Sequence, residues 1–177
     1  LWVCCDLEWE LGQRLVDRLL AERGHTAGER AYMRAIRDAR MRLYEVVEVK
    51  PGTSLTLRPV GSSGRDVTVR ERSASQQLHR GELLATRVVA VGASGHPEMD
   101  GGTMRYSEGQ RPRVLQAVEQ ELAELRELLP EPSDDDLWRQ MPPVLHQQWR
   151  TFRMPRMHNY DDEPIVMTRV RFEVRDP

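Results

Sequence analysis

The hydrophobic period of this chain changes near Leu43, and that change is the strongest constraint on its fold. Before this residue, apolar side chains recur at helical spacing; after it, short runs rich in β-branched residues alternate with turn signals. The runs are "LYEVVEV", "SLTLRPV", "DVTVRER" and "LLATRVVAV", separated by Pro51-Gly52, by "GSSG" at 61–64 and by Arg80-Gly81. Strands this short and closely spaced predict a small antiparallel β-barrel of SH3-like or OB-like type over residues 42–106, with a further strand near Met104–Tyr106.

Residues 1–41 carry the pattern of two helices. The apolar face of the first consists of Leu11, Leu15, Val16, Leu19 and Leu20. Thr26 and Glu29 form a capping box that opens the second helix, because each side chain can satisfy a backbone N–H of the other residue. The apolar face of that helix consists of Tyr32, Met33, Ile36, Ala39 and Leu43. The short link between the two patterns predicts a helical hairpin.

Residues 107–153 form a second helical segment. Ser107 and Gln110 make a capping box there. The apolar stripe of the helix that follows consists of Val114, Leu115, Val118, Leu122, Leu125 and Leu129. Ser133 starts another helix, which Pro142-Pro143 interrupts. In residues 154–177, "PIVMTRVRFEV" alternates as a half-buried strand does, which indicates the β element of an incomplete C-terminal unit. The predicted fold class is therefore α+β.

Composition and charge exclude several classes of protein. Hydrophobic residues make up 39% and charged residues 31%, and the net charge is −2, which gives no global attraction to nucleic acid or anionic lipid. No apolar run reaches the roughly 18 residues of a membrane span, so no membrane partner is expected. The adjacent Cys4 and Cys5 are poorly placed to bridge each other, which favours a reducing, cytoplasmic setting. The chain opens at Leu1 without a methionine, so we expect it to be a piece of a longer protein.

Part of the chain is similar to known sequences. "LYEVVEVKPGTSLTLRPV" and "VTVRERSASQQLHRGELLATRVVAVG" resemble a segment of uncharacterised bacterial proteins that often carry a SEC-C zinc-binding motif. "HNYDDEPIVMTRVRFEV" resembles a downstream element of the same proteins. The resemblance implies no known reaction. The zinc motif needs several spaced cysteines, and this chain has only Cys4 and Cys5, so no metal ligand is carried over.

Two serines and a histidine in "RERSASQQLHRGELL" suggest a nucleophile at first sight. A serine nucleophile needs a base, an orienting acid and an oxyanion hole, and the Gly-x-Ser-x-Gly elbow is absent here. We interpret the stretch as a turn between strands that end near Arg72 and start near Leu83. Leu78 is expected to fold onto the barrel end. The side chains expected to lie in the loop without a catalytic partner are Ser73, Ser75 and His79. The "GSSG" turn is expected to be an exposed hairpin tip that tolerates insertion.

Metal-dependent chemistry has a weak signal. Glu48 and Lys50, ten residues after Asp38, imitate the acid…acid-x-Lys pattern of nucleases, in which a carboxylate holds Mg²⁺ and an ammonium orients water. Asp134–Asp136 reads as the charged start of a helix, and Asp161–Glu163 beside His158 reads as a solvated turn. Cys4, Cys5 and His25 lack the spacing of a zinc site. No metal ligand, cofactor or catalytic residue is assigned from the sequence.

Arginines on the barrel strands are the candidate binding residues. Arg58, Arg70, Arg72 and Arg87 each alternate with apolar neighbours. Several of them could therefore share the outer face, where guanidinium groups suit phosphate. The barrel offers only Tyr44 and Tyr106 as aromatic platforms for bases, and acidic residues dilute the charge.

Three functions remain open at this point. The first is a non-catalytic protein-interaction or scaffold module of a larger bacterial protein, with a protein as its partner. The second is a nucleic-acid-binding small barrel that uses the four arginines. The third is a metal-dependent nuclease centred on Glu48.

Overall fold

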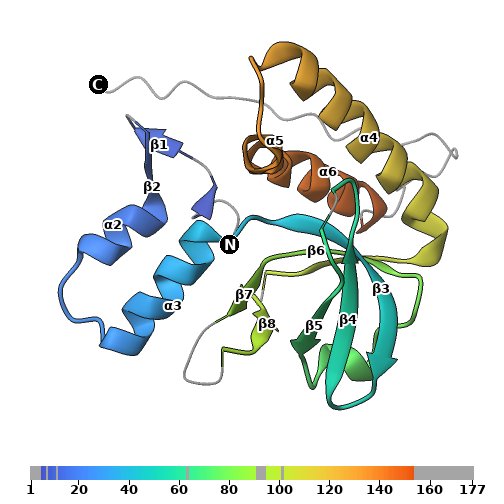
Figure 1. Ribbon diagram of the computed structural model, residues 1–177, viewed down its shortest axis with the longest axis horizontal. Coiled ribbons are helices and arrows are strands. Elements are labelled where there is room, and N and C mark those ends of the chain that lie inside the picture. Colours follow the sequence, from blue (N-terminus) through green and yellow to red (C-terminus); the bar gives the residue numbers. More distant parts are fainter. Residues whose placement is uncertain are drawn as a thin grey trace, which may run out of the picture.

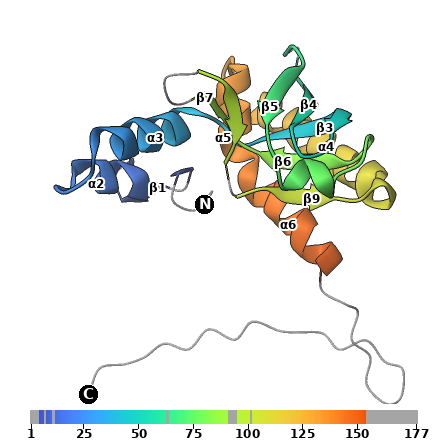
Figure 2. The ribbon, with the colours of Figure 1, turned by 90° about the horizontal axis from the view of Figure 1, so that it is seen from below.

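The protein has an α+β fold built on one curled sheet of seven strands, which confirms the predicted class (Figure 1). The computed structural model describes residues 5–6, 8–10, 12–62, 64–90, 95–100 and 102–153. The strand predicted within residues 154–177 lies outside these ranges. Figures 1 and 2 show one group of helices, α4 to α6, over the sheet and a second group, α2 and α3, beside it.

The strands follow the predicted runs with one addition. They are β3 (Arg42–Lys50), β4 (Ser54–Pro59), β5 (Val67–Arg70), β6 (Leu83–Thr86), β7 (Val88–Ala90), β8 (Pro97–Met99) and β9 (Met104–Tyr106). Their order in the sheet is β7-β8-β5-β4-β3-β6-β9. The unexpected strand, β8, runs parallel to β5 through the pair Arg70 and Glu98, whereas the other pairs are antiparallel. The sheet is therefore mixed, and the prediction of a purely antiparallel one is wrong at this pair.

The sheet curls because β6 and β7 are one bent stretch of chain. Only Arg87 separates them, yet β6 pairs with β3 while β7 pairs with β8, near the other end of the strand order. The result is a half-barrel whose concave side is apolar. The buried side chains gathered there are Tyr44, Val46, Leu55, Leu57, Val69, Leu78 and Leu84. Alternation along each strand leaves polar residues such as Arg58 on the opposite side.

Three helices cover the other part of the sheet. They are α4 (Arg111–Leu128), preceded by the short η2 (Glu108–Gln110), then α5 (Asp134–Gln140) and α6 (Pro142–Arg153). The capping box predicted at Ser107 is present, and Ser133, the predicted helix start, forms a capping box with Asp136. The core between these helices and the sheet includes Leu43, Leu83, Tyr106, Val118, Leu122, Trp138 and Leu145. The Tyr106 hydroxyl donates a hydrogen bond to the Leu145 carbonyl oxygen at 2.6 Å, which joins β9 to α6. None of the described helices is both long and apolar enough to cross a membrane.

The N-terminal part differs from the predicted pattern before Leu15. A small hairpin, β1 (Glu8–Glu10) with β2 (Gln13–Arg14), precedes α2 (Leu15–Ala21), so the first helix is shorter than its apolar periodicity indicates. The helix α3 (Ala27–Asp38) begins at the predicted capping box, but Leu43 belongs to β3 and not to α3. A third apolar cluster joins these helices to β7 and contains Cys5, Val16, Ile36 and Val89.

The "GSSG" turn links β4 to β5 and is not free of tertiary contacts. Gly61 has φ +73°, a left-handed conformation that favours glycine. A Cβ atom at this position would lie 3.1 Å from Leu122 Cδ1 and 3.5 Å from Trp138 Cζ2. Gly61 and Gly64 are exposed, as predicted, but Gly61 also lies beside α4 and α5, so this end of the turn has little room for a larger residue.

Replacing Gly61 with alanine is expected to lower the free energy of unfolding by about 1–2 kcal/mol, since a left-handed residue with a Cβ is strained. Urea denaturation checks this loss. Gly12→Ala is the matched control, because Gly12 has φ +78° but no atom within 4 Å of its would-be Cβ. If the two variants lose equal stability, the cost of Gly61→Ala comes from backbone strain alone, and the closeness of α4 and α5 adds nothing to it.

Candidate functional site

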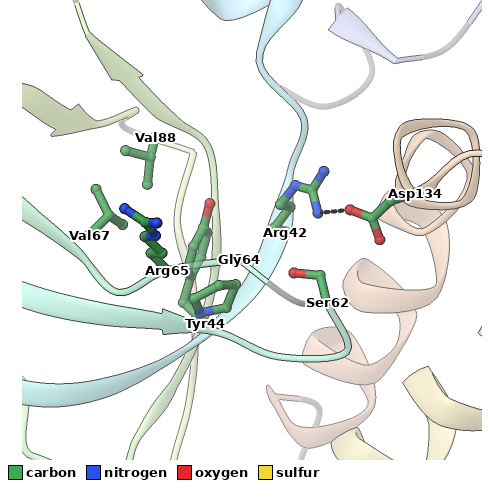
Figure 3. A pocket seen from close by; sticks show the side chains of 9 residues that line it. Arg42, Tyr44, Ser62, Gly64, Arg65, Val67, Val88 and Asp134 are labelled. Atoms are coloured by element: carbon green, nitrogen blue, oxygen red, sulfur yellow. Dashed lines mark hydrogen bonds and ion pairs between the residues drawn. The ribbon is translucent and has the colours of Figure 1, made fainter.

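A hollow of about 450 Å³ opens where the curled sheet meets α5, and we call it the mouth pocket (Figure 3). It is lined by Arg42, Tyr44, Pro59, Ser62, Gly64, Arg65, Val67, Val88 and Asp134. These residues come from β3, from the end of β4 and the turn after it, from β5, β7 and α5. Val67 and Val88 also pack against the apolar concave side of the sheet, so the pocket is continuous with the half-barrel interior.

Arg42 stands at the side of the mouth pocket nearest α5. Its Nη1 donates to Asp134 Oδ2 at 2.5 Å, and its Cζ lies 5.7 Å from the centroid of the Trp138 ring. A guanidinium group over an indole face is attracted by the negative charge of that face. Arg42 is therefore held by two residues of α5, and its side chain remains 23% exposed.

Tyr44 and Arg65 supply the other polar groups of the mouth pocket. Tyr44 is buried, and this burial raises the pKa of its phenol, while the nearby charge of Arg42 opposes the rise. The hydroxyl is therefore neutral at physiological pH and can donate a hydrogen bond. Arg65 is exposed and has no ion pair with any residue in the described ranges. In the view of Figure 3, Arg65 and Val67 lie on one side of Tyr44, and Arg42 lies on the other.

The acidic triplet at the start of α5 has three separate contacts. Asp136 completes the predicted cap with Ser133, and this hydrogen bond lowers the pKa of its carboxyl. Asp134 pairs with Arg42, and Asp135 pairs with Arg40 at 2.8 Å. Sequence reasoning assigned the triplet to helix capping alone. It missed the ion pairs because their partners lie more than ninety residues away.

The mouth pocket combines a few polar groups with apolar walls. Its polar groups are two guanidinium groups, a phenol, a serine hydroxyl and one carboxylate that is already paired. Arginine and tyrosine donate hydrogen bonds to anions, and the proline and valine side chains offer apolar walls. Among the described residues that line the pocket there is no histidine or cysteine, so these residues form no serine–histidine or cysteine–histidine pair. The arrangement suits a ligand with one negative charge beside an apolar group.

The four predicted arginines do not form one surface. Arg58 makes a bidentate pair with Asp66, with both N–O distances at 3.0 Å, and this hydrogen bonding lowers the pKa of the Asp66 carboxyl. Arg70 is exposed on β5, and Arg72 is exposed just after it. Arg87 is fully buried and does not share their face. The expected stripe of free guanidinium groups is thus reduced to Arg70 and Arg72.

Arg87 instead joins the N-terminal part to the bend of the sheet. Its Nη2 pairs with the Asp6 carboxylate, whose side chain is only 4% exposed. Its Nη1 donates to the carbonyl oxygens of Ile36 and Ala39 at the end of α3. The alternating pattern did predict a strand here, but the bend between β6 and β7 turns this side chain inward.

The stretch from Arg72 to Leu83 is a turn, as predicted. It contains a short η1 helix (Ala74–Gln76) between the end of β5 and the start of β6, and Leu78 is buried in the half-barrel. Ser75 Oγ donates to the Arg72 carbonyl oxygen at 3.0 Å, so this serine caps the turn and is itself buried. The His79 backbone N–H donates to Glu82 Oε2. No hydrogen bond joins His79 to either serine among the described residues.

The nuclease pattern is not assembled into one cluster. Asp38 pairs with Arg37 at 2.7 Å, whereas Glu48 pairs with Lys50 at 3.7 Å and accepts a hydrogen bond from Thr56. Within the described ranges, no three His, Cys, Asp or Glu side chains are grouped so that they could hold a metal ion. Cys5 is buried in the apolar cluster that contains Val16, Ile36 and Val89. Cys4, His158 and the triplet 161–163 lie outside the described residues.

The chain matches a known family of proteins. A family of unknown function, DUF7986, matches residues 6–127. No curated protein and no solved structure matches the chain. The matched range contains both partners of the buried Asp6–Arg87 pair and the whole curled sheet, and it ends near the end of α4. Because the match spans well over half of the sequence, the chain belongs to the DUF7986 family.

Proposed function

We propose that this chain is a non-catalytic protein-interaction module of a larger, cytoplasmic bacterial protein, and that its mouth pocket binds an acidic segment of a partner protein. The observation that carries the proposal is the charge of that pocket. Arg65 is exposed and lacks an ion pair to any described residue, and it stands with Arg42 and a neutral Tyr44 beside apolar walls. A glutamate or aspartate flanked by aliphatic residues complements this lining in both charge and polarity.

We also infer that the curled sheet is a small barrel of SH3-like or OB-like type, with α2 and α3 as a helical hairpin docked on it. The support is the single residue, Arg87, between β6 and β7, which lets one bent strand link β3 to β8. Ligand sites are common at the mouths of β-barrels. The resemblance to bacterial proteins that often carry a SEC-C motif supports the expectation of a longer polypeptide.

Nucleic-acid binding is the second candidate function. Arg70 and Arg72 favour it, because one is exposed at the end of β5 and the other is exposed two residues later. Arg58 is neutralised by Asp66, and Arg87 is buried, so the guanidinium groups left to contact phosphates are few. A metal-dependent nuclease has less support, since Asp38 and Glu48 have separate partners.

A titration with two peptides tests the proposed function. The probe is Gly-Ser-Leu-Glu-Leu-Ser-Gly, and its counterpart carries Gln in place of Glu; binding is followed by NMR shifts of the isotope-labelled chain. We expect the Glu peptide to shift mouth-pocket amides and to bind more tightly than the Gln peptide. Arg65→Glu is expected to weaken this binding about tenfold, because it reverses a charge that faces the ligand carboxylate.

Arg70→Glu is the matched control, since it makes the same charge change on the neighbouring strand β5, outside the pocket lining. Its effect should stay below that of Arg65→Glu. Equal binding of the Glu and Gln peptides, or an equal loss in the two variants, would contradict the proposed site. Salt-sensitive binding of an oligothymidylate that Arg70→Glu abolishes would support the nucleic-acid candidate instead.

A further inference from the structure

We infer that Asp134 is a competitor, within the chain itself, for the carboxylate that the mouth pocket binds, and that an occupied pocket loosens α5 from β3. This inference rests on the proposed function, because it concerns the regulation of the same site. Asp134 is the one carboxylate among the described residues that line the pocket. It occupies Arg42 in the way that a ligand carboxylate would.

The exposure of this ion pair makes exchange feasible. The Asp134 side chain is 48% exposed, and the Arg42 side chain is 23% exposed. An ion pair open to water contributes little to stability, so a second carboxylate can replace it at low cost. Two carboxylates next to one guanidinium group also repel each other, which drives Asp134 towards solvent when the ligand enters.

The exchange has a structural consequence because Arg42 connects β3 to α5. Arg42 contacts the first turn of α5 through Asp134 and the following turn through Trp138. Losing the first contact loosens the N-terminal turn of α5, which is then held through the Asp135–Arg40 pair. The helix as a whole stays in place, since Trp138 is fully buried and Asp135 keeps its pair with Arg40.

The cap of α5 is independent of this pair. Ser133 Oγ accepts from the Asp136 backbone N–H at 3.2 Å, and the Asp136 carboxylate accepts from Ser133 in return. Asp134 takes part in neither hydrogen bond. Removing its charge therefore changes the contact with Arg42 without removing the start of the helix.

Thermodynamic coupling of this kind is reciprocal. The binding free energy that the ligand loses in displacing Asp134 is therefore gained when it binds to a variant that lacks this charge. Asp134→Asn is expected to tighten binding of the Leu-Glu-Leu peptide about two- to fivefold, the range that an exposed ion pair corresponds to. The same peptide is expected to speed hydrogen exchange of the amides in the first turn of α5. Both effects should be absent with the Gln peptide.

Asp135→Asn is the matched control. Asp135 is the next residue, it is 49% exposed, and the charge change is the same, but it pairs with Arg40 and does not line the pocket. A larger gain in peptide affinity for Asp134→Asn than for Asp135→Asn supports competition for Arg42. An equal gain in affinity for both variants indicates general electrostatics and overturns the inference.

The failure of the inference and the failure of the proposed function can be told apart. If Arg65→Glu weakens binding but Asp134→Asn does not tighten it beyond Asp135→Asn, the pocket binds acidic peptide and Asp134 is no competitor. If Arg65→Glu has no effect, the proposed function itself is wrong. If Asp134→Asn tightens binding but the peptide leaves hydrogen exchange in the first turn of α5 unchanged, Asp134 is a competitor whose displacement does not loosen that turn, and this part of the inference is wrong.

Discussion

Asp6→Ala is expected to lower the free energy of unfolding by about 3–5 kcal/mol, the range for removing one partner of a buried ion pair. The variant leaves the Arg87 guanidinium fully buried with only the carbonyl oxygens of Ile36 and Ala39 as acceptors. The dipoles of two carbonyl groups compensate a full charge poorly. Urea denaturation, followed by far-UV circular dichroism, measures the loss.

Two further variants separate the ion pair from other effects. Asp66→Ala removes the partner of Arg58, whose pair lies in solvent, and is expected to leave stability nearly unchanged. Asp6→Asn combined with Arg87→Met removes both charges at the buried site and is expected to recover part of the loss, because no unpaired charge remains. If Asp6→Ala costs no more than Asp66→Ala, the N-terminal part is not anchored through Arg87.

Leu78→Asp is expected to destabilise the protein by about 4 kcal/mol or more, since deleting a buried leucine costs 2–5 kcal/mol and burying a carboxylate adds to this. Leu78 is 6% exposed and packs inside the half-barrel with Val46, Leu55 and Leu84. Leu78 belongs to the connection between β5 and β6, and its side chain covers the apolar concave side of the sheet. The same denaturation experiment measures the change.

The neighbouring residue provides the control for Leu78→Asp. His79 is exposed, and its hydrogen bonds with Glu82 are made by its backbone, so His79→Ala is expected to change stability by no more than about 0.5 kcal/mol. Leu78→Met keeps the apolar volume and is expected to cost about 1.5 kcal/mol or less. A mild effect of Leu78→Asp would mean that the connection does not close the half-barrel.

The elements that the sequence predicted correctly are those with a local signal. The caps at Thr26 and Ser133 depend on residues three positions apart, and the stripe of α4 depends on spacings of three and four. The strands from β3 to β6 follow period-two alternation or short β-branched runs. Each of these signals is complete within one turn or one strand, so no distant part of the chain was needed to read it.

Short segments without a repeating pattern were missed. The strand β8 has three residues and begins with Pro97, while β1 has three residues and β2 has two. Three residues cannot display an alternation, and a proline argues against a strand. These strands form because neighbouring backbone groups need hydrogen-bond partners, which is a property of the assembled sheet.

The sequence by itself determined where the helices and the longer strands lie and which of their faces are apolar. Tertiary structure alone decided the roles of the charged residues. Arg87 and Arg58 look alike in an alternating strand, yet the bend between β6 and β7 buries the first against Asp6, and the second stays in solvent with Asp66. Arg42 and Asp134 meet across 92 positions at the edge of a pocket that five separate segments enclose. An arginine has the same helix or strand preference whether it is buried, paired or free, so its partner is fixed only when the chain has folded.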